Sequence, residues 1–399
     1  MTELDIIVAG HLCLDIYPDL SGMEREPFEK TFLPGRLIST GPVTFCTGGA
    51  VSNTGLALHR LGLSTRLISK VGDDLFGQAI LQIIKSHGER LADGMQIDPT
   101  ASTSYTVMIN YPGVDRIFLH YPGANDTFSA GDVPYEAIRQ ARLFHFGYPP
   151  IMRTIYLEDG MQLVEIFRRA KESGVTTSLD MAFPDPASAS GRADWRRILE
   201  RALPFVDIFL PSVEESLFML RRDLYFRLSE TSGHDGIVSL LTPELLSSLG
   251  SELLGMGAKI VVLKLGDHGL YLRTADAPAL ANLGRAQPFD LSAWGQREFW
   301  APCFKVRVAG TTGAGDATIA GFLAAFLRGF TPEATLTTAV AVGACNVEAA
   351  DTLTGILSWE ATRERISRGW PRRPLSLQTD GWEFDPASGH WRGPALGTA

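Results

Sequence analysis

Short apolar segments that alternate with helix-patterned stretches constrain the fold of this chain more than any other feature. The segments are nearly continuous in apolar residues, as strands buried on both faces are. They lie at Ile6–Ala9, Arg66–Val71, Leu143–Phe146, Val175–Leu179, Val206–Leu210 and Ile260–Leu263. Between them come stretches with the apolar spacing of a helix, such as residues 159–174. The alternation predicts an α/β protein with a mostly parallel sheet, helices on both faces, and ligands at the carboxyl ends of the strands.

Two regions depart from this alternation. Residues 105–121 are predicted to form a half-exposed β-hairpin, because apolar and polar residues alternate on both sides of the turn Pro112-Gly113-Val114-Asp115. Together with the extended stretch at about 12–46, they predict a small sheet that covers a cleft. The C-terminal GWEFDPASGHWRGP predicts a second hairpin. An isolated hairpin is marginally stable in water, so we expect it to dock on the body or on a partner subunit.

The chain is therefore divided into three parts. We expect a main α/β domain of residues 1–11, 47–101 and 124–369, a β lid of residues 12–46 and 102–123, and a Trp-containing C-terminal hairpin of residues 370–399. Within the main domain, residues 276–298 are expected to form a loop.

Charge and cysteine content exclude several classes of protein. The 399 residues carry a net charge of −9 without a block of Lys and Arg, so a nucleic-acid partner is not expected. No apolar stretch is long enough to predict a membrane span. The four cysteines (Cys13, Cys46, Cys303 and Cys345) have no metal-site spacing, which predicts thiols in a reducing compartment. We expect a cytoplasmic protein.

The strongest chemical signal is GTTGAGDATIAGFLAAFLRG, residues 310–329. Gly313, Ala314 and Gly315 let backbone N–H groups approach a ligand, and the helix that follows adds its dipole, so this turn predicts an anion site. Asp316 would repel a phosphate, but it is well placed to take a proton from a hydroxyl that attacks one. The alternative is that Asp316 caps an ordinary helix.

A second glycine-rich turn lies in CTGGAVSNTGLALHRLG, residues 46–62. Gly48 and Gly49 again bring the backbone close to a neighbouring group at a predicted helix start. Asn53, one turn further, offers a donor and an acceptor to a polyol. The alternative is a simple turn with Asn53 in solvent.

With these two motifs the chain resembles the ribokinase-like (PfkB-type) carbohydrate kinases. The early GGAVSN and the late TTGAGD are similar to that family's two signature regions, and the resemblance covers residues 5–361. Four further segments are similar to family segments: GHLCLDIYP, KVGDDLFG, VDIFLPSVEES and VVLKLGDHGLYL. The resemblance implies a Rossmann-like α/β domain with a small β lid, which agrees with the alternation and the hairpin.

The resemblance also implies an ATP- and Mg²⁺-dependent phosphotransferase that acts on a sugar-like hydroxyl. Asp316 would be the general base, and the amides of Gly313, Ala314 and Gly315 would hold the transferring phosphoryl group. The nucleotide would lie along Lys264, Gly266, Gly269, Thr311 and Asn346. The substrate would be held by Asp15, Gly48, Gly49 and Asn53. Glu215 would act on the Mg²⁺ side through water.

Three residues depart from the family pattern. Gly310 stands where the family usually has an Asp that helps bind a monovalent cation, which puts K⁺ activation in doubt. Ser212 replaces the Asn of the N-x-x-E motif near Mg²⁺. Ala50 replaces the Lys of ribose kinases, which argues against ribose.

Other interpretations remain open at this point. A nucleoside kinase of the same fold would need an aromatic wall, for which Phe45, Tyr105 and Tyr111 are candidates. A member that lost catalysis would bind a sugar as a regulator. Asp180, at the end of a predicted strand, either contacts a ligand or caps a loop. We expect a homodimer formed through the lid.

Overall fold

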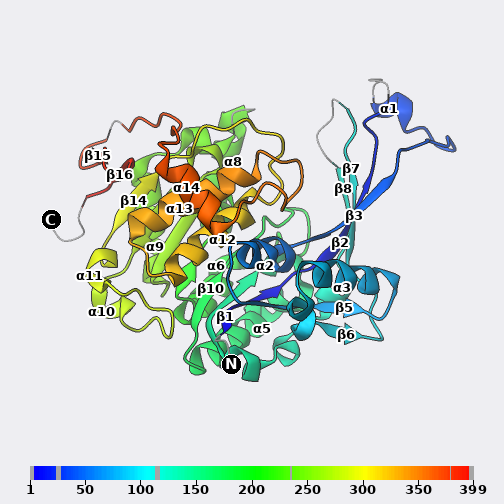
Figure 1. The fold of residues 1–399 in the computed structure, drawn as a ribbon, viewed down its shortest axis with the longest axis horizontal. Helices are drawn as coiled ribbons and strands as arrows, with labels where there is room; N and C mark the ends of the chain where they lie inside the picture. The colour runs from blue at the N-terminus through cyan, green and yellow to red at the C-terminus, as the bar shows by residue number, and fades with distance from the viewer. Residues whose placement is uncertain (1–3, 24–27, 113–116, 234–235, 378, 395–399) are drawn as a thin grey trace.

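A computed structural model describes residues 4–23, 28–112, 117–233, 236–377 and 379–394. Its main sheet has ten strands in the order β15-β16-β14-β13-β12-β11-β10-β9-β1-β4 (Figure 1). The parallel part comprises β4 (Thr65–Ile68), β1 (Leu4–Gly10), β9 (Ala141–Gly147), β10 (Thr176–Leu179), β11 (Ile208–Phe209) and β12 (Ile260–Lys264). The antiparallel part comprises β13 (Leu270–Thr274), β14 (Glu298–Ala301), β16 (His390–Arg392) and β15 (Glu383–Asp385). The predicted mostly parallel sheet is confirmed.

Helices cover both faces of this sheet. One face carries α2 (Ala50–Arg60), α3 (Leu75–His87), α12 (Ala314–Leu327) and α13 (Pro332–Asn346). The other carries α5 (Arg153–Glu172), α6 (Trp195–Ala202), α7 (Val213–Leu220) and α9 (Pro243–Gly255). In β1, Ile6 and Val8 join the first core while Ile7 and Ala9 join the second, and all four are fully buried. Burial on both faces explains why the strand segments are continuously apolar.

The lid is a separate four-stranded sheet that stands away from the body as an arm (Figure 1). Its strands, in order, are β3 (Val43–Gly48), β2 (Cys13–Pro18), β7 (Tyr105–Ile109) and β8 (Ile117–Tyr121). β7 and β8 form the predicted antiparallel hairpin, although most of its turn lies outside the described residues. A short helix, α1 (Phe28–Thr31), packs against Tyr111 near the outer end of the arm.

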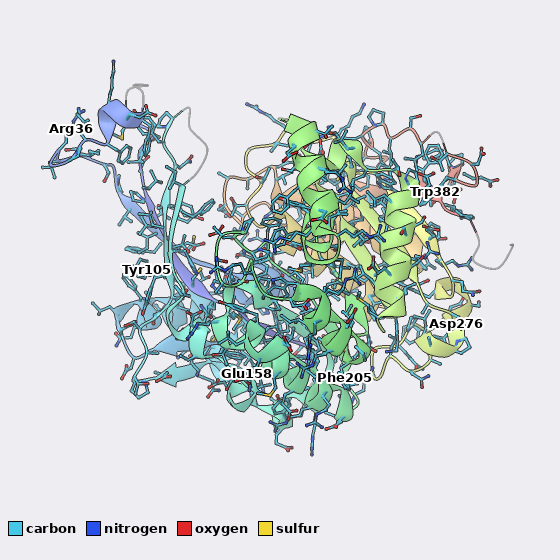
Figure 2. The ribbon with its side chains drawn as sticks, turned by 180° about the vertical axis from the view of Figure 1, so that it is seen from behind. Arg36, Tyr105, Glu158, Phe205, Asp276 and Trp382 are labelled. Carbon is cyan, nitrogen blue, oxygen red and sulfur yellow. The ribbon has the colours of Figure 1, made fainter. Side chains whose placement is uncertain are left out.

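The C-terminal hairpin docks on the body of its own chain. β15 pairs with β16, and β16 pairs with β14 to extend the main sheet. Trp382 is buried on this extension, at the end of the molecule opposite to Arg36 of the lid (Figure 2). Before the hairpin, α14 (Trp359–Ser367) leads to Trp370, which stacks on Phe304 with 4.4 Å between ring centroids.

The structure differs from the sequence expectations in two places. The expected strand over residues 66–71 is divided into β4 and β5 (Lys70–Gly72), because Ser69 between them donates a hydrogen bond to the Gly10 carbonyl at 2.7 Å. The expected loop at 276–298 contains α10 (Ala277–Leu280) and α11 (Leu291–Trp294), whose first amides are capped by Asp276 and Asp290.

The remaining elements lie around these layers. They are β6 (Gln96–Asp98), which pairs with β5, and the helices α4 (Tyr135–Ile138) and α8 (Arg222–Ser232). Within the described ranges, no helix combines the length and the apolar character needed to cross a membrane.

Candidate active site

Asp316 lies in the first turn of α12 and is buried. It does not cap its own helix, whose N-cap residue is Gly313 with a φ of 73°. Its carboxylate instead accepts hydrogen bonds from α2, through Asn53 Nδ2 at 3.0 Å and Thr54 Oγ1 at 3.2 Å. The hydroxyl of Tyr148, which follows β9, donates to the same carboxylate at 2.8 and 2.9 Å from its two oxygens. The fold thus joins the two glycine-rich motifs at one carboxylate.

The surroundings of Asp316 suit a general base. Burial raises the pKa of this carboxyl, and the donors Tyr148, Asn53 and Thr54, together with the charge of Lys264, oppose that rise. Burial and the nearby Asp316 raise the pKa of Tyr148 far above its usual value, so its hydroxyl stays protonated and donates. A carboxylate with a raised pKa accepts a proton more readily than an exposed one.

Lys264, the last residue of β12, forms a buried ion pair with Asp180, just after β10, with 2.5 Å between Nζ and Oδ1. Burial lowers the pKa of Lys264, but the carboxylates of Asp180, Glu215 and Asp316 outweigh that effect and raise it. The end of the Lys264 side chain lies against Gly315, where a Cβ would be 3.6 to 3.8 Å from it. Asp180 therefore holds a lysine at the anion turn.

Glu215 and Ser212 form a capping box at the start of α7. The Ser212 amide donates to Glu215 Oε2 at 2.6 Å, and the Glu215 amide donates to Ser212 Oγ at 3.1 Å. Ser212 also forms a bridge with Lys264, which places Glu215 beside the Lys264–Asp180 pair. The serine that departs from the family pattern thus keeps Glu215 in place.

The carboxylates beside Lys264 fit a magnesium ion held mainly through water. Asp180 Oδ2 is buried without a hydrogen-bond partner, and Glu215 lies close enough to Asp180 to raise its pKa. Among the described residues, no group of three or more His, Cys, Asp and Glu is arranged to hold a metal. Mg²⁺ commonly binds through one or two carboxylates, waters and substrate phosphates, which matches this donor set.

Asp15 lies on β2, beside the glycine-rich turn that precedes α2. A Cβ on Gly48 would lie 2.2 Å from Asp15 Oδ2, so the glycine makes room for this carboxylate. Cys13 Sγ donates to Asp15 Oδ1 at 3.2 Å, and burial raises the pKa of Asp15 to about 6. Asp15 is thus held on β2, next to the turn that leads to Asn53.

His11 lies next to this turn and was not among the predicted site residues. A Cβ on Gly49 would lie 2.5 Å from both His11 Nδ1 and the His11 carbonyl oxygen, and φ of Gly49 is 88°. The ring is buried, neither nitrogen has a hydrogen-bond partner, and burial lowers the pKa of His11 to about 3. In this structure the two glycines make room for Asp15 and His11.

A cavity of about 310 Å³ lies against the first turn of α12. Its lining includes six residues from the predicted nucleotide and anion sites: Lys264, Gly266, Gly269, Thr311, Ala314 and Gly315. Its other walls are mainly apolar, with Phe304, Val306, Val308, Val340 and Val347. The predicted Asn346 does not line the cavity; its Nδ2 donates to the Thr352 carbonyl at 2.9 Å.

The anion turn is partly occupied by its own hydrogen bonds. The Ala314 amide donates to the Thr311 carbonyl at 3.2 Å, whereas Gly315 stands at the second position of α12, where an amide has no acceptor within the helix. The amide of Gly315 is therefore better placed to bind an anion than that of Ala314.

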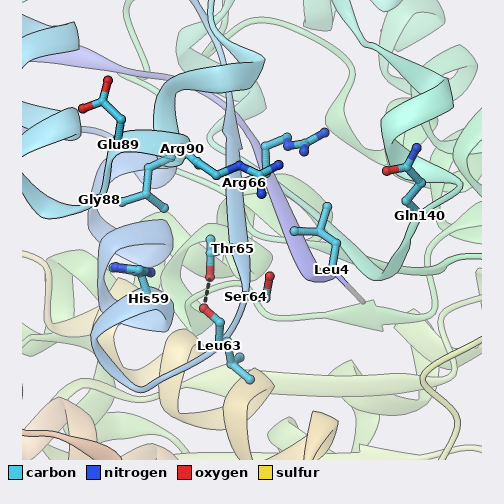
Figure 3. A pocket seen from close by; sticks show the side chains of 11 residues that line it. Leu4, His59, Leu63, Ser64, Thr65, Arg66, Gly88, Glu89, Arg90 and Gln140 are labelled. Carbon is cyan, nitrogen blue, oxygen red and sulfur yellow. Dashed lines mark hydrogen bonds between the residues drawn. The ribbon is translucent and has the colours of Figure 1, made fainter. Parts of the chain in front are cut away.

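A second cavity, of about 630 Å³, lies at the opposite edge of the sheet (Figure 3). Its lining includes Leu4, Thr65 and Gln140, which stand at or just before the amino ends of β1, β4 and β9. Arg66 and Arg90 also line it (Figure 3). Ligands of parallel sheets bind at the carboxyl ends, so the region around Asp316 is the candidate active site.

Sequence reasoning missed Tyr148, Thr54 and His11. Tyr148 directly follows β9 and precedes two prolines, so its place at the carboxyl end of a strand was an available signal. Thr54 is the neighbour of the predicted Asn53. No sequence pattern indicated that His11 would be buried beside Gly49.

Asp316 is thus a buried carboxylate in the first turn of a helix, it accepts hydrogen bonds from polar side chains of α2, and the same turn lines the cavity of about 310 Å³. The family model for pfkB family carbohydrate kinases matches residues 8–359. The chain belongs to this family, and it is a phosphotransferase that acts on a sugar hydroxyl.

Known relatives agree with this class. The chain is similar to "Probable fructokinase-6, chloroplastic" of Arabidopsis thaliana, with 27% identity over 80% of this chain and 69% of that protein. Its fold is similar to Arabidopsis thaliana ribokinase complexed with ribose and ATP, with a TM-score of 0.65, 19% identity, and 91% and 98% of the two chains covered. Fructokinase with bound ATP from Xylella fastidiosa gives a TM-score of 0.67, 20% identity, and 91% and 98% coverage.

Proposed function

We propose that this sugar kinase transfers the γ-phosphoryl group of ATP to a carbohydrate hydroxyl, with Asp316 as the general base. The position of Asp316 carries the proposal, because it lies in the first turn of α12, which lines the cavity, and its carboxylate contacts Asn53 of α2. The acceptor oxygen gives its proton to Asp316 while it bonds to the γ-phosphorus. The bond from that phosphorus to the leaving oxygen of ADP breaks in the same step.

The other groups of the site stabilise the phosphates. The amides at the start of α12, from Gly313 to Gly315, and the Lys264 ammonium group face the transferring phosphoryl group. Glu215 and Asp180 would hold Mg²⁺ through water, and the ion would neutralise phosphate charge. We expect no requirement for K⁺, because Gly310 offers no carboxylate to a monovalent cation.

The acceptor side favours a neutral sugar. Asp15 and Asn53 accept hydrogen bonds from sugar hydroxyls, and the carboxylates of Asp15 and Asp316 repel an acidic or phosphorylated acceptor. The aromatic residues considered for a nucleobase wall are not gathered in one place. Tyr105 packs against Phe76 and Tyr121, whereas Tyr111 packs against α1.

The lid presents an apolar surface for a second copy of the chain. Val43, Phe45 and Leu119 are each about half exposed and share one face of the lid sheet, on β3 and β8, and a dimer would cover them. All four cysteines are free thiols, which supports a reducing, cytoplasmic location. Sedimentation of the wild type and of Leu119→Ser tests the dimer, and a monomeric wild type would contradict it.

An assay of ADP release tests the proposed function. The purified chain, ATP and Mg²⁺ are combined with neutral hexoses and pentoses, sugar acids, sugar phosphates or nucleosides, with and without K⁺. We expect release with a neutral sugar, independence of K⁺, and loss of activity in Asp316→Asn. Release with nucleosides alone would support the nucleoside kinase. ATP binding with no turnover on any acceptor would support a non-catalytic role.

A further inference from the structure

Tyr148 makes the shortest contacts to the carboxylate of Asp316. Its hydroxyl lies 2.8 Å from Oδ2 and 2.9 Å from Oδ1, so one proton is shared between the two oxygens. Thr54 is a second donor to Oδ1, and Asn53 is a second donor to Oδ2. A carboxylate accepts about four hydrogen bonds, so three donors, one of which is shared between the two oxygens, leave room for one more proton.

The backbone at Tyr148 is strained in a way that directs the side chain into the site. Tyr148 has φ 69° and ψ 43°, the left-handed region that residues other than glycine rarely adopt. Such strain persists where the surroundings enforce it, and it concentrates at functional sites. Here Gly147 at the end of β9 and the prolines Pro149 and Pro150 bracket the turn. The turn sends the phenol toward Asp316.

We propose that Tyr148 is a positioning residue for phosphoryl transfer, which holds the Asp316 carboxylate ionised and aimed at the acceptor. When the acceptor hydroxyl binds, the shared hydrogen bond of Tyr148 contracts onto one carboxylate oxygen and frees a lone pair on the other. The proton of the acceptor then passes to that oxygen, and the proton of Tyr148 stays on the phenol. The inference rests on the proposed role of Asp316 as the base.

The charged groups around Asp316 contribute little to keeping its carboxylate ionised, so this role is left to neutral donors such as Tyr148. Lys264, the one cation among the groups that influence the pKa of Asp316 in the described structure, already pairs with Asp180. The carboxylates of Asp180 and Glu215 face the same lysine and offset its charge. His11, whose ring centroid is 6.3 Å from that of Tyr148, is neutral because burial lowers its pKa to about 3. The neutral donors therefore supply most of the local stabilisation of the charged carboxylate.

Tyr148→Phe tests the proposal, because it removes the hydroxyl and keeps the ring. Loss of a hydrogen bond to a charged group is expected to raise the pKa of Asp316 by about one to two units. The acid limb of the pH profile of kcat/KM for the acceptor should move up by the same amount. Activity on the acid limb should fall about ten- to hundredfold, which is the same shift expressed as a rate, and recover at high pH, and KM for ATP should stay within about twofold. Tyr156→Phe, on α5 and without a contact to Asp316, is the matched control.

Two further measurements separate this inference from the proposed function and from misfolding. The carbon-13 signal of the Asp316 carboxyl, assigned by its absence in Asp316→Asn, reports the pKa without turnover. Fluorotyrosine at position 148 is a stronger donor of nearly the same size, so it should move the pKa down while Tyr148→Phe moves it up. Equal titration in wild type, Tyr148→Phe and the fluorotyrosine protein would overturn the inference, and so would an increase in kcat for Tyr148→Phe.

Discussion

Two buried aspartates lie at opposite edges of the main sheet and differ in their partners. Asp207, at the amino end of β11, is fully buried and pairs with Lys171 at 2.5 Å and Lys259 at 2.9 Å. It also accepts hydrogen bonds from the amide and the hydroxyl of Thr177. Asp316, at the carboxyl edge, has three neutral donors and no ion pair among the described residues. The charge of Asp207 is compensated by two cations, whereas that of Asp316 is not, which suits the proposed general base.

The difference shows how one fold assigns stability and chemistry to separate edges. A buried charge with two cations and two further donors ties α5, β10, β11 and β12 together and has little capacity left for a ligand. A buried carboxylate with neutral donors is less stable as an anion, and that is what a general base requires. Substitution of Asp207 should therefore mainly lower the free energy of unfolding, whereas substitution of Asp316 should mainly lower kcat.

Asp316→Asn is expected to have the largest effect, a decrease in kcat of about 10²- to 10⁴-fold, because the acceptor proton loses its base. The free energy of unfolding should be unchanged or higher, since a poorly compensated buried charge is removed. Steady-state kinetics and denaturant unfolding measure the two quantities. Near-normal turnover would remove Asp316 from the mechanism.

Asp207→Ala is expected to lower the free energy of unfolding by about 3 kcal/mol, because it leaves Lys171 and Lys259 close together without their shared carboxylate. At a temperature where the variant remains folded, KM for ATP and kcat should be close to those of the wild type. An Asp207→Ala variant of normal stability with low kcat would contradict the proposal that Asp207 serves stability and Asp316 serves catalysis.

The acceptor side should respond to pH through Asp15, whose pKa burial raises to about 6. Below pH 6 the carboxyl becomes protonated and loses capacity to accept sugar hydroxyls, so KM for the acceptor should rise by up to about tenfold per pH unit. Because the folded pKa exceeds the unfolded one, ionisation between about pH 4 and 6 destabilises the native state. Asp15→Asn should flatten the KM profile and be more stable relative to wild type at pH 8 than at pH 4.

Arg373 should give the smallest effect. It lines the nucleotide cavity, pairs with Asp267 at 2.9 Å, and lies beyond the residues matched by the family model. Half-exposed ion pairs contribute about 0 to 1 kcal/mol. Arg373→Gln should therefore raise KM for ATP by about two- to fivefold at unchanged kcat. Arg368→Gln, an exposed substitution outside that lining, is the control, and an equal effect there would remove Arg373 from the nucleotide site.

Much of the fold was predictable because its strands are buried on both faces. Continuous apolar runs such as Leu143–Phe146 identified the parallel strands, and the alternation around residues 105–121 identified the hairpin of the lid. The division of residues 66–71 was not predictable, because it depends on a hydrogen bond from Ser69 to the distant Gly10. The two short helices within residues 276–298 begin at aspartate caps. Aspartates in a polar stretch are equally typical of a loop, so these helices were not predicted.

Within the site, the residues whose role depends on local geometry could be identified from the sequence. Glycines before a helix predict an anion turn wherever the helix lies, and Asp316 and Gly315 follow from that pattern. Only the tertiary structure decided which distant groups meet there. Asn53 contacts Asp316 across 263 residues, Tyr148 across 168, and Lys264 meets Asp180 across 84. The order of strands in the sheet determines these contacts, and the charge and proton affinity of Asp316 depend on them because burial is a property of the folded chain.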